Sequence, residues 1–541
     1  MKFKRVITLL LALFLIFSTT LAGCGEKSNS KEAIINLGTE PPQMNPILTS
    51  DVASMNILRA TGEGLVRLDQ NSRPIPGMAE KWIVSPDGLN YTFKLRDAKW
   101  SNGKPVTAYD FEFAWKSVLK PENAATYPYV FYMIKGARAY NEGTGKVEDI
   151  GIKVIDDKTL EVTLEQLTPY FIDLCAFGVY HPVNQEFYEK QISGDNPLYG
   201  TEADKMLFNG PWVIKSWAHE DKIVLEKNPD YYNAKEIKLD KITLLMINDS
   251  NTAYNMFAAG EADLVNLKGS DQIEKAKSDG YAPSKYSEGT TVYFEFNLND
   301  PVLTNTNIRK ALTYAIDRES LITKIFKNSS TPAFSFTSPE LKGLKTNFQS
   351  EVGNLFKDNN SEEAKQLLQK GLSELGLSSL PSLVLLTDDS DNAKRDAAAY
   401  QEFWKNNLGV DAEIQTMPFK SRVERLIAKD FQVSMGIWGP DYNDPLTFMD
   451  LWETDAGNND VSYSSKEYDD LLNKIRAETD AEKRFDLLVQ AEKKLMEDMP
   501  IGPLYFRNLD YVVKPYLKGV VRNAFQDIDL YWAYIDDTSK K

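Results

Sequence analysis

The fold class is decided by three strand-like segments: LVLL at Leu383–Leu386, VDAEIQ at Val410–Gln415 and VSMGIW at Val433–Trp438. Between them lie two segments with helical periodicity, Lys394–Asn407 and Lys420–Ala428. This strand-helix-strand-helix-strand order predicts parallel strands joined by right-handed crossovers. The sequence therefore predicts an α/β fold, in which a ligand crevice lies beyond the carboxyl ends of the strands.

The segment after the third strand is Gly439-Pro440-Asp441-Tyr442-Asn443-Asp444-Pro445. Glycine and proline favour a turn, so Asp441 is expected just beyond the strand end, at the predicted crevice. Two interpretations of Asp441 remain open from the residues alone: a carboxylate that binds a ligand, or an acid that closes its own turn. Asp444 precedes Pro445 and is better explained as the cap of a helical segment through Trp452.

Strand and helix patterns alternate through the rest of the chain, as in α/β and α+β proteins. Thr107 with Asp110 three residues later resembles a capping box, and Pro121 ends that helix. No repeat of about 20 to 50 residues is visible, which argues against solenoids and propellers. The other expected elements are strands at Ala33–Leu37 and Tyr91–Leu95, a helix at Val52–Ala60, and a hairpin of Ile152–Val154 with Thr159–Leu164.

The N-terminus has the features of an export signal. Three basic residues precede a mostly apolar segment, residues 6–17, which has the length of a signal-peptide core and is short for a membrane span. Leu21-Ala22-Gly23-Cys24 then matches a bacterial lipobox, in which the cysteine thiol accepts a lipid. We expect residues 1–23 to be a signal peptide and residues 24–32 a lipidated tether that holds the protein on the extracytoplasmic face of the cell membrane. The alternative is an ordinary signal peptide followed by an incidental cysteine.

Charge and cysteine content narrow the class of function. The formal net charge is −16, and removal of the three basic residues of the signal leaves −19, which argues against binding nucleic acid. Cys175 is the only cysteine besides Cys24, so no internal disulfide is possible once Cys24 carries lipid. Cys175 lies in an apolar run and is expected to be a buried small hydrophobic residue.

The residue inventory does not favour an enzyme. The chain has two histidines, His181 and His219, and neither lies in an HExxH helix. It has no GxSxG motif, and Gly143-Thr144-Gly145-Lys146 lacks the first glycine and the Ser/Thr of a phosphate-binding loop. We therefore expect no catalytic residue, no metal site and no cofactor. A glycosidase needs only two carboxylates, and 78 acidic residues leave that alternative open.

Ordered motifs run through the whole chain after the signal. They are GTEPPQMNP at Gly38–Pro46, PGMAEKW at Pro76–Trp82, RDAKWSNGKPVTAYDF at Arg96–Phe111, NGPW at Asn209–Trp212, NPDYY at Asn228–Tyr232, IRKAL at Ile308–Leu312, AIDR at Ala315–Arg318 and WGPDYNDP at Trp438–Pro445. In this order and spacing they resemble the family 5 extracellular solute-binding proteins, most closely the oligopeptide-binding members that serve bacterial ABC importers.

The resemblance implies a two-lobed periplasmic-binding-protein type II fold with an additional domain inserted in the first lobe. It places lobe I at residues 33–51, 178–288 and 501–541, the extra domain at 52–177, and lobe II at 289–500. It also implies a monomer that captures oligopeptides and delivers them to the permease and ATPase subunits of an ABC importer. The alternative of the same fold is a peptide-pheromone receptor. A nickel or haem receptor is disfavoured by the scarcity of histidine.

The family's aspartate that binds the peptide amine corresponds to Asp441. An extended peptide added as a strand would also meet backbone groups on both sides of the cleft. The further residues expected at the ligand are Met435, Ile437, Trp438 and Gly439 on one side, Thr39, Glu40 and Pro41 on the other, and Tyr129 and Tyr505. Trp438 could instead be core, and Tyr127 competes with Tyr129 for a place at the cleft or in the core of the extra domain.

This sequence departs from its relatives at the position of Met435, where enterobacterial oligopeptide binders carry an arginine that helps to receive the peptide carboxylate. A histidine with a similar role in those relatives aligns near Ala393. We therefore expect either Lys394 or Arg395 to receive the carboxylate, or the C-terminus to project unbound. Both cations could equally lie on the solvated face of their helix.

Overall fold

The computed structural model describes residues 31–49, 51–193, 198–389, 391–454 and 456–539. The expected signal peptide, Cys24 and the tether up to residue 30 lie outside these residues. The first strand, β1, begins at Glu32, the last residue assigned to the tether. In the described part of the chain, no helix is both long enough and apolar enough to cross a membrane.

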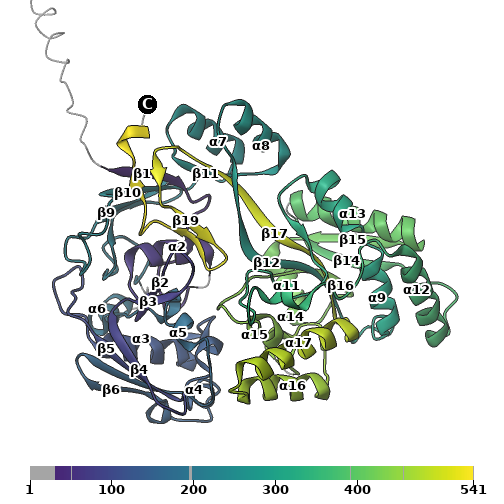
Figure 1. The fold of residues 1–541 in the computed structure, drawn as a ribbon, viewed down its shortest axis with the longest axis horizontal. Coiled ribbons are helices and arrows are strands. Elements are labelled where there is room, and N and C mark those ends of the chain that lie inside the picture. The colour runs from purple at the N-terminus through teal and green to yellow at the C-terminus, as the bar shows by residue number, and fades with distance from the viewer. Residues whose placement is uncertain (1–30, 50, 194–197, 390, 455, 540–541) are drawn as a thin grey trace, which may run out of the picture.

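One large mixed sheet runs through both lobes (Figure 1). Its strand order is β15-β14-β16-β12-β17-β11-β1-β10-β9-β8. The short strand β13 also pairs with β17, outside this order. The strands are β1 (Glu32–Asn36), β8 (Trp212–Ala218), β9 (Lys222–Lys227), β10 (Lys241–Leu245), β11 (Leu264–Leu267), β12 (Ser284–Phe296), β13 (Thr331–Pro332), β14 (Leu383–Asp388), β15 (Ala412–Met417), β16 (Val433–Trp438) and β17 (Ile501–Val513).

Two long antiparallel strands, β12 and β17, connect the lobes (Figure 1). Their ladder is interrupted between Ser287 and Thr290, where Gly289 has a φ of +69°. A Cβ on Gly289 would lie 2.8 Å from both Pro440 and Ala524, so a larger side chain has no room at this crossing. The expected boundary at 288/289 falls at this interruption. The expected boundary at 500/501 falls at the lobe II end of β17, which crosses to lobe I further along its length.

Lobe II contains the parallel unit predicted from the sequence. β14 pairs in parallel with both β15 and β16, and helices α13 (Asp391–Leu408) and α14 (Phe419–Ile427) form the two crossovers. The predicted bounds of β16 are confirmed. On the core side, the ring of Phe294 packs against Tyr400 and Trp404 at centroid distances of 5.0 and 5.1 Å. This packing fixes β12 against α13.

The extra domain is built on a separate four-stranded sheet of order β4-β5-β7-β6. Its strands are β4 (Ala79–Val84), β5 (Asn90–Leu95), β6 (Ile152–Asp156) and β7 (Thr159–Thr163), so the predicted hairpin is confirmed. Helix α3 (Ala108–Leu119) begins at the predicted capping box, where Asp110 accepts the N–H of Thr107 at 2.8 Å. Cys175 is buried and free.

The remaining elements cover these sheets. The helices are α2 (Val52–Thr61), α4 (Ala137–Asn141), α5 (Phe171–Leu174), α6 (Gln185–Ile192), α7 (Ser250–Ala259), α8 (Gly269–Ser278), α9 (Thr306–Tyr314), α10 (Arg318–Ser320), α11 (Phe348–Val352), α12 (Ser361–Leu375), α15 (Leu446–Met449), α16 (Lys466–Ala477) and α17 (Ala481–Asp498). The short strands are β2 (Val66–Leu68), β3 (Pro74–Pro76), β18 (Leu517–Lys518), β19 (Val521–Asn523), β20 (Gln526–Asp529) and β21 (Tyr534–Ile535).

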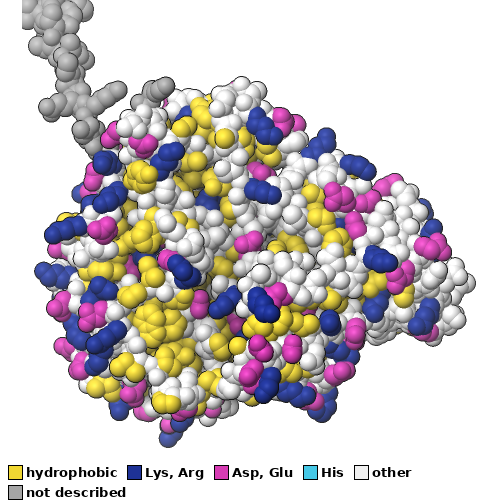
Figure 2. Space-filling model, in the orientation of Figure 1, with side chains coloured by type: hydrophobic (Ala, Val, Ile, Leu, Met, Phe, Trp, Pro, Cys, Tyr) yellow, Lys and Arg dark blue, Asp and Glu magenta, His cyan; other side chains and the backbone are white. Residues whose placement is uncertain are grey.

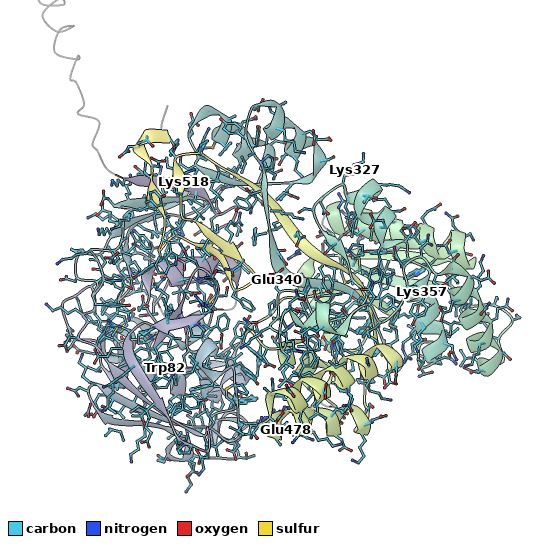
Figure 3. All side chains as sticks on the ribbon, viewed as in Figure 1. Trp82, Lys327, Glu340, Lys357, Glu478 and Lys518 are labelled. Carbon is cyan, nitrogen blue, oxygen red and sulfur yellow. The ribbon has the colours of Figure 1, made fainter. Side chains whose placement is uncertain are left out.

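Charged side chains of both signs are interspersed over the face seen in Figure 2. In Figure 3, Trp82 lies on the extra domain and Lys357 on lobe II. Glu340 lies near the centre, where lobe II faces lobe I and the extra domain. That central region is where the candidate site is found.

Candidate functional site

A cavity of about 510 Å³ lies between the two lobes. One wall is the segment Ile437–Asn443, at the end of β16. The facing wall comes from α2, from residues 62–72 and from the β19–β20 hairpin. Residues between 173 and 181 complete this wall. A volume of this size is within the range of about 300 to 1,000 Å³ typical of small-molecule sites. The cavity therefore occupies the position predicted from strand topology, beyond the carboxyl end of β16.

The segment after β16 is held by hydrogen bonds to the start of the next helix. The indole N–H of Trp438 donates to the carbonyl of Thr447 at 2.9 Å. The backbone N–H of Asp441 donates to the hydroxyl of Thr447 at 3.1 Å. Thr447 therefore fixes both ends of the Gly439–Pro440 turn. Trp438 and Gly439 both line the cavity, and the Trp438 ring is partly buried.

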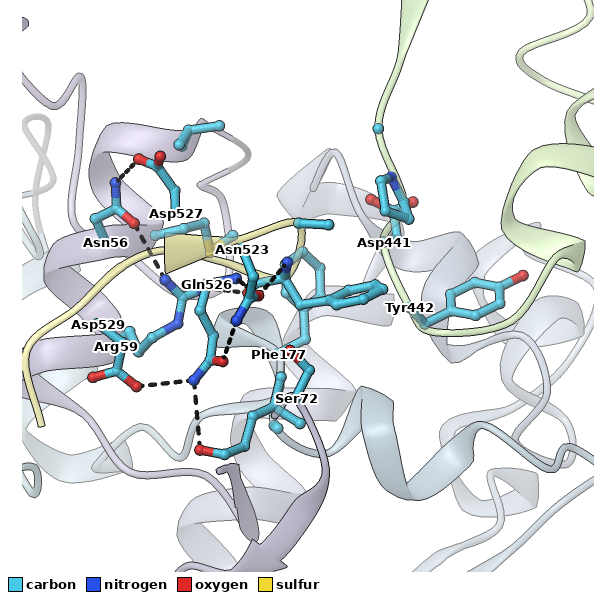
Figure 4. A pocket seen from close by; sticks show the side chains of 18 of the residues that line it. Asn56, Arg59, Ser72, Phe177, Asp441, Tyr442, Asn523, Gln526, Asp527 and Asp529 are labelled. Carbon is cyan, nitrogen blue, oxygen red and sulfur yellow. Dashed lines mark hydrogen bonds between the residues drawn. The ribbon is translucent and has the colours of Figure 1, made fainter. Parts of the chain in front are cut away.

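Asp441 lies on the lobe II segment across from Asn56, Arg59 and Gln526 of the facing wall (Figure 4). Its carboxylate accepts a hydrogen bond of 3.0 Å from the hydroxyl of Tyr129, in the extra domain. Burial raises the pKa of Asp441 to about 6, although the Tyr129 hydroxyl lowers it. In the described part of the chain, Asp441 has no cationic partner within 4 Å and accepts no hydrogen bond from its own turn. The side chain is thus directed at the cavity and does not close the turn.

Asp444 lies next to the cap position of α15, which is Pro445 and makes no side-chain cap hydrogen bond, so Asp444 supports the start of the helix from one residue earlier than expected. Its carboxylate accepts the N–H of Leu446, in the first turn of α15, at 3.1 Å. Arg484 also donates to both of its oxygens, at 2.8 and 2.9 Å. This bidentate pair neutralises Asp444, in contrast to Asp441 three residues earlier.

Aromatic residues of the extra domain contact lobe II beside the cavity, where Tyr127 is in the lining and Tyr129 and Tyr170 lie outside it. Tyr127 lines the cavity, and its ring centroid lies 5.6 Å from that of Tyr129. Tyr170, from the same domain, stacks on Tyr442 at 4.0 Å with an interplanar angle of 9°. The extra domain therefore contacts lobe II at two neighbouring residues, Asp441 through Tyr129 and Tyr442 through Tyr170.

Two further residues expected at the ligand lie outside the lining of this cavity. The sulfur of Met435 accepts a contact of 3.7 Å from the Thr387 hydroxyl, and its side chain packs against the lobe II core. The hydroxyl of Tyr505 donates to Asp396 at 3.2 Å and is buried. Ile437 lines the cavity and is 49% exposed.

Thr39, Glu40 and Pro41 also lie outside the cavity lining. The Glu40 carboxylate accepts hydrogen bonds from the Trp217 indole at 2.8 Å and from the backbone N–H of Glu220 at 2.7 Å, and lies 2.8 Å from a ring nitrogen of His219. The proposed contacts of these three residues with a peptide backbone stay predictions.

The facing wall contains functional candidates that the sequence did not indicate. Asn56 on α2 donates to Asp527 on the β19–β20 hairpin at 2.7 Å, and Arg59 donates to Asn56 and to the carbonyl of Phe525 (Figure 4). His181 is buried at this wall, and burial together with the nearby arginines lowers its pKa to about 3, so the imidazole is neutral. These segments are hundreds of residues apart, and no local pattern connects them.

The described residues contain no group of three or more His, Cys, Asp or Glu side chains placed to hold a metal ion. The side chains that line the cavity provide hydrogen-bonding groups, aromatic faces, carboxylates and guanidinium groups. Such an arrangement suits recognition of a polar organic ligand.

Comparison with known proteins agrees with this geometry. The model of the bacterial extracellular solute-binding proteins, family 5, matches residues 73–460. The chain is 39% identical to the oligopeptide-binding protein OppA of Bacillus subtilis, with 97% of this chain and 98% of that protein covered. The structure of Listeria monocytogenes OppA bound to peptide is 34% identical, with a TM-score of 0.81, and the match covers 94% of this chain and 99% of that one.

A structure of the pheromone receptor PrgZ is also similar, at 31% identity and a TM-score of 0.82, with 94% of this chain and 100% of that one covered. These structures confirm the two-lobed type II fold. The named relatives are solute-binding proteins, which supports a role other than catalysis. On sequence and structure together, this chain belongs to the bacterial extracellular solute-binding proteins of family 5.

Proposed function

We propose that this protein is the substrate-binding subunit of an ABC importer and that it captures oligopeptides in the cavity between its lobes. The observation that carries the proposal is the carboxylate of Asp441, which is partly buried at the cavity and has no cation beside it among the described residues. A free peptide amine is a cation of suitable size for this position. The oligopeptide-binding names of the relatives support the same ligand class.

The peptide amine would form a charge-assisted hydrogen bond with Asp441, in place of or beside the Tyr129 hydroxyl. Backbone groups next to Asp441 would pair with the extended peptide as a strand does. Since both interactions use groups that every peptide has, the ligand's sequence matters less than its free amine. The surrounding cavity provides room for different side chains.

Closure of the two lobes would complete the site. Asp441 lies on lobe II and Tyr129 on the extra domain, so their hydrogen bond exists only when the two bodies meet. β12 and β17 form the connection about which the lobes could turn. The closed form with bound peptide would then be presented to the permease.

A lipid on Cys24 would keep the protein at the outer face of the membrane, near the importer. The Leu21–Cys24 lipobox and the apolar segment before it support this part of the proposal. The lobes would be connected to the lipid by the short polar segment Gly25–Lys31.

The proposal is tested by thermal unfolding with a library of peptides, because a ligand that binds only the folded state raises the unfolding temperature. We expect peptides with a free amine to stabilise the protein without being cleaved. Cleavage of the peptides, or no stabilisation by any of them, would contradict the proposal.

A peptide-pheromone receptor is the second candidate, favoured by the similarity to PrgZ over 94% of the chain. The two functions differ in ligand range. A receptor would bind one sequence far more tightly than scrambled versions of it, whereas a nutrient importer would bind many sequences with similar affinity. Mass spectrometry of co-purifying peptides separates these outcomes.

A further inference from the structure

The side chains that line the cavity include more acidic than basic groups. Seven carboxylates and three guanidinium groups contribute to its walls. The carboxylates are Asp51, Glu63, Asp173, Glu288, Asp441, Asp527 and Asp529, and the guanidinium groups are Arg59, Arg67 and Arg507. His181 adds no charge, because burial keeps it neutral.

Most of these carboxylates have a local partner. Arg67 pairs with Glu63 at 2.8 Å and lies 3.6 Å from Asp529. Arg507 pairs with Glu288, and Arg522, just behind the wall, pairs with Asp527 at 3.1 Å. Asp51 caps α2 by accepting the N–H of Ser54 at 2.8 Å.

Three of the seven carboxylates have no cation within 4 Å in the described part of the chain: Asp51, Asp173 and Asp441. Asp51 is hydrogen-bonded at the start of α2, and Asp441 accepts the Tyr129 hydroxyl. Asp441 is assigned to the peptide amine. Asp173 lies on α5 and receives no hydrogen bond from another described residue. Burial raises the pKa of Asp173 to about 6, and Lys342 offsets this only in part, from beyond ion-pair distance.

Asp173 and Asp441 belong to adjoining segments. Tyr170 lies three residues before Asp173, and its ring stacks at 4.0 Å on Tyr442, the neighbour of Asp441. A ligand whose amine is at Asp441 would therefore pass its first residues close to α5. Phe177 and Tyr442, both in the lining, add aromatic surface on which the methylene stem of a long side chain could lie (Figure 4).

We propose that Asp173 is a subsite for a cationic side chain, lysine or arginine, near the amino end of the bound peptide. The inference rests on the proposed function and refines its substrate class from peptides in general to peptides with a basic residue close to the free amine. Such a side chain would pair with Asp173 and reduce the excess of carboxylates in the closed cavity.

The test is a set of short peptides that differ at one position, with lysine, norleucine or glutamate there, and with that position moved along the first four residues. Norleucine has a similar aliphatic side chain and no ammonium group, so it separates charge from apolar contact. Isothermal titration should give lysine at least a tenfold advantage over norleucine at one of the positions, and a disadvantage for glutamate there. Equal affinities for lysine and norleucine at every position would overturn the subsite.

Asp173→Asn keeps the shape and removes the charge. We expect it to abolish the lysine advantage and to leave binding of the norleucine peptides unchanged, which also shows that the variant is folded. Asp173→Lys should reverse the preference toward glutamate. If the lysine advantage survives Asp173→Asn, another carboxylate is responsible and the assignment is wrong. If none of the peptides binds the wild-type protein, the proposed function itself fails, and the subsite fails with it.

Discussion

The partly buried carboxylate of Asp441 should favour the open form of the peptide-free protein. In the closed arrangement of the lobes, Asp441 is largely removed from water, and among the described residues its side-chain partner is the Tyr129 hydroxyl. When they open, the carboxylate regains its hydration and its ordinary pKa. Asp441→Asn removes the charge and keeps an oxygen that can accept the Tyr129 hydrogen bond, so it should allow the empty protein to close.

The size of the effect follows from the pKa. A rise from 3.8 to about 6 on closure corresponds to about 3 kcal/mol, or roughly 150-fold in the ratio of open to closed molecules. Because the raised pKa means that the closed state binds the proton more tightly, closure is disfavoured as the pH rises from about 4 to about 6. The full penalty is present above about pH 6 and disappears below about pH 4.

Small-angle X-ray scattering of the peptide-free protein measures this equilibrium. At pH 8 we expect a larger radius of gyration for the wild type than for Asp441→Asn. Asp97→Asn is a matched control, because the Asp97 side chain is fully exposed, and it should scatter like the wild type. Equal radii for the wild type and Asp441→Asn at pH 8, or a wild type already closed there without peptide, would refute the reasoning.

Three further predictions concern the tyrosine, the lipid and the carboxyl end of the ligand. Tyr129→Phe should raise the pKa of Asp441 further in the closed empty protein, since the hydroxyl lowers it now; the pH dependence of closure would shift upward, and an unchanged dependence would argue against this contact. Cys24→Ser should release the protein from the membrane fraction or leave an unprocessed precursor, and wild-type protein without added mass on Cys24 would contradict lipidation. A series of peptides of two to ten residues, with free or amidated C-termini, should show either a broad length range or a carboxylate effect lost in Lys394→Ala or Arg395→Ala. Arg395 lies 3.2 Å from Asp396, so its substitution is best compared with Lys394→Ala, which leaves that pair intact. A sharp length optimum that vanishes on amidation and survives both substitutions would exclude both possibilities: binding of the carboxylate by Lys394 or Arg395, and an unbound C-terminus.

The elements that are determined by residues close together in the chain could be predicted from the sequence. The strands and crossovers of lobe II, the capping box at Thr107 and the position of Asp441 all follow from residues close together in the chain, because strand ends and turns are set locally. The extra domain and the two lobes required the resemblance to a family. β17 pairs with β12 and also with β11, so this strand runs through both lobes, and the boundary expected at its first residue stays a prediction.

The facing wall of the cavity could not be predicted in the same way. Asn56 and Asp527 are 471 residues apart, and Tyr170 meets Tyr442 from another domain. Such contacts depend on how complete domains pack, and a single sequence contains no local pattern for them. Asp173 is a further example: its place in an apolar segment gave no sign that it faces a cavity.

The most direct test of the central claim compares one peptide with a free amine and its N-acetylated form, each titrated into wild-type protein and Asp441→Asn at pH 8. If the amine pairs with Asp441, acetylation should cost about 2 to 5 kcal/mol of binding free energy with the wild type and little with Asp441→Asn. Equal affinity of the wild type for the free and acetylated peptides would contradict the account.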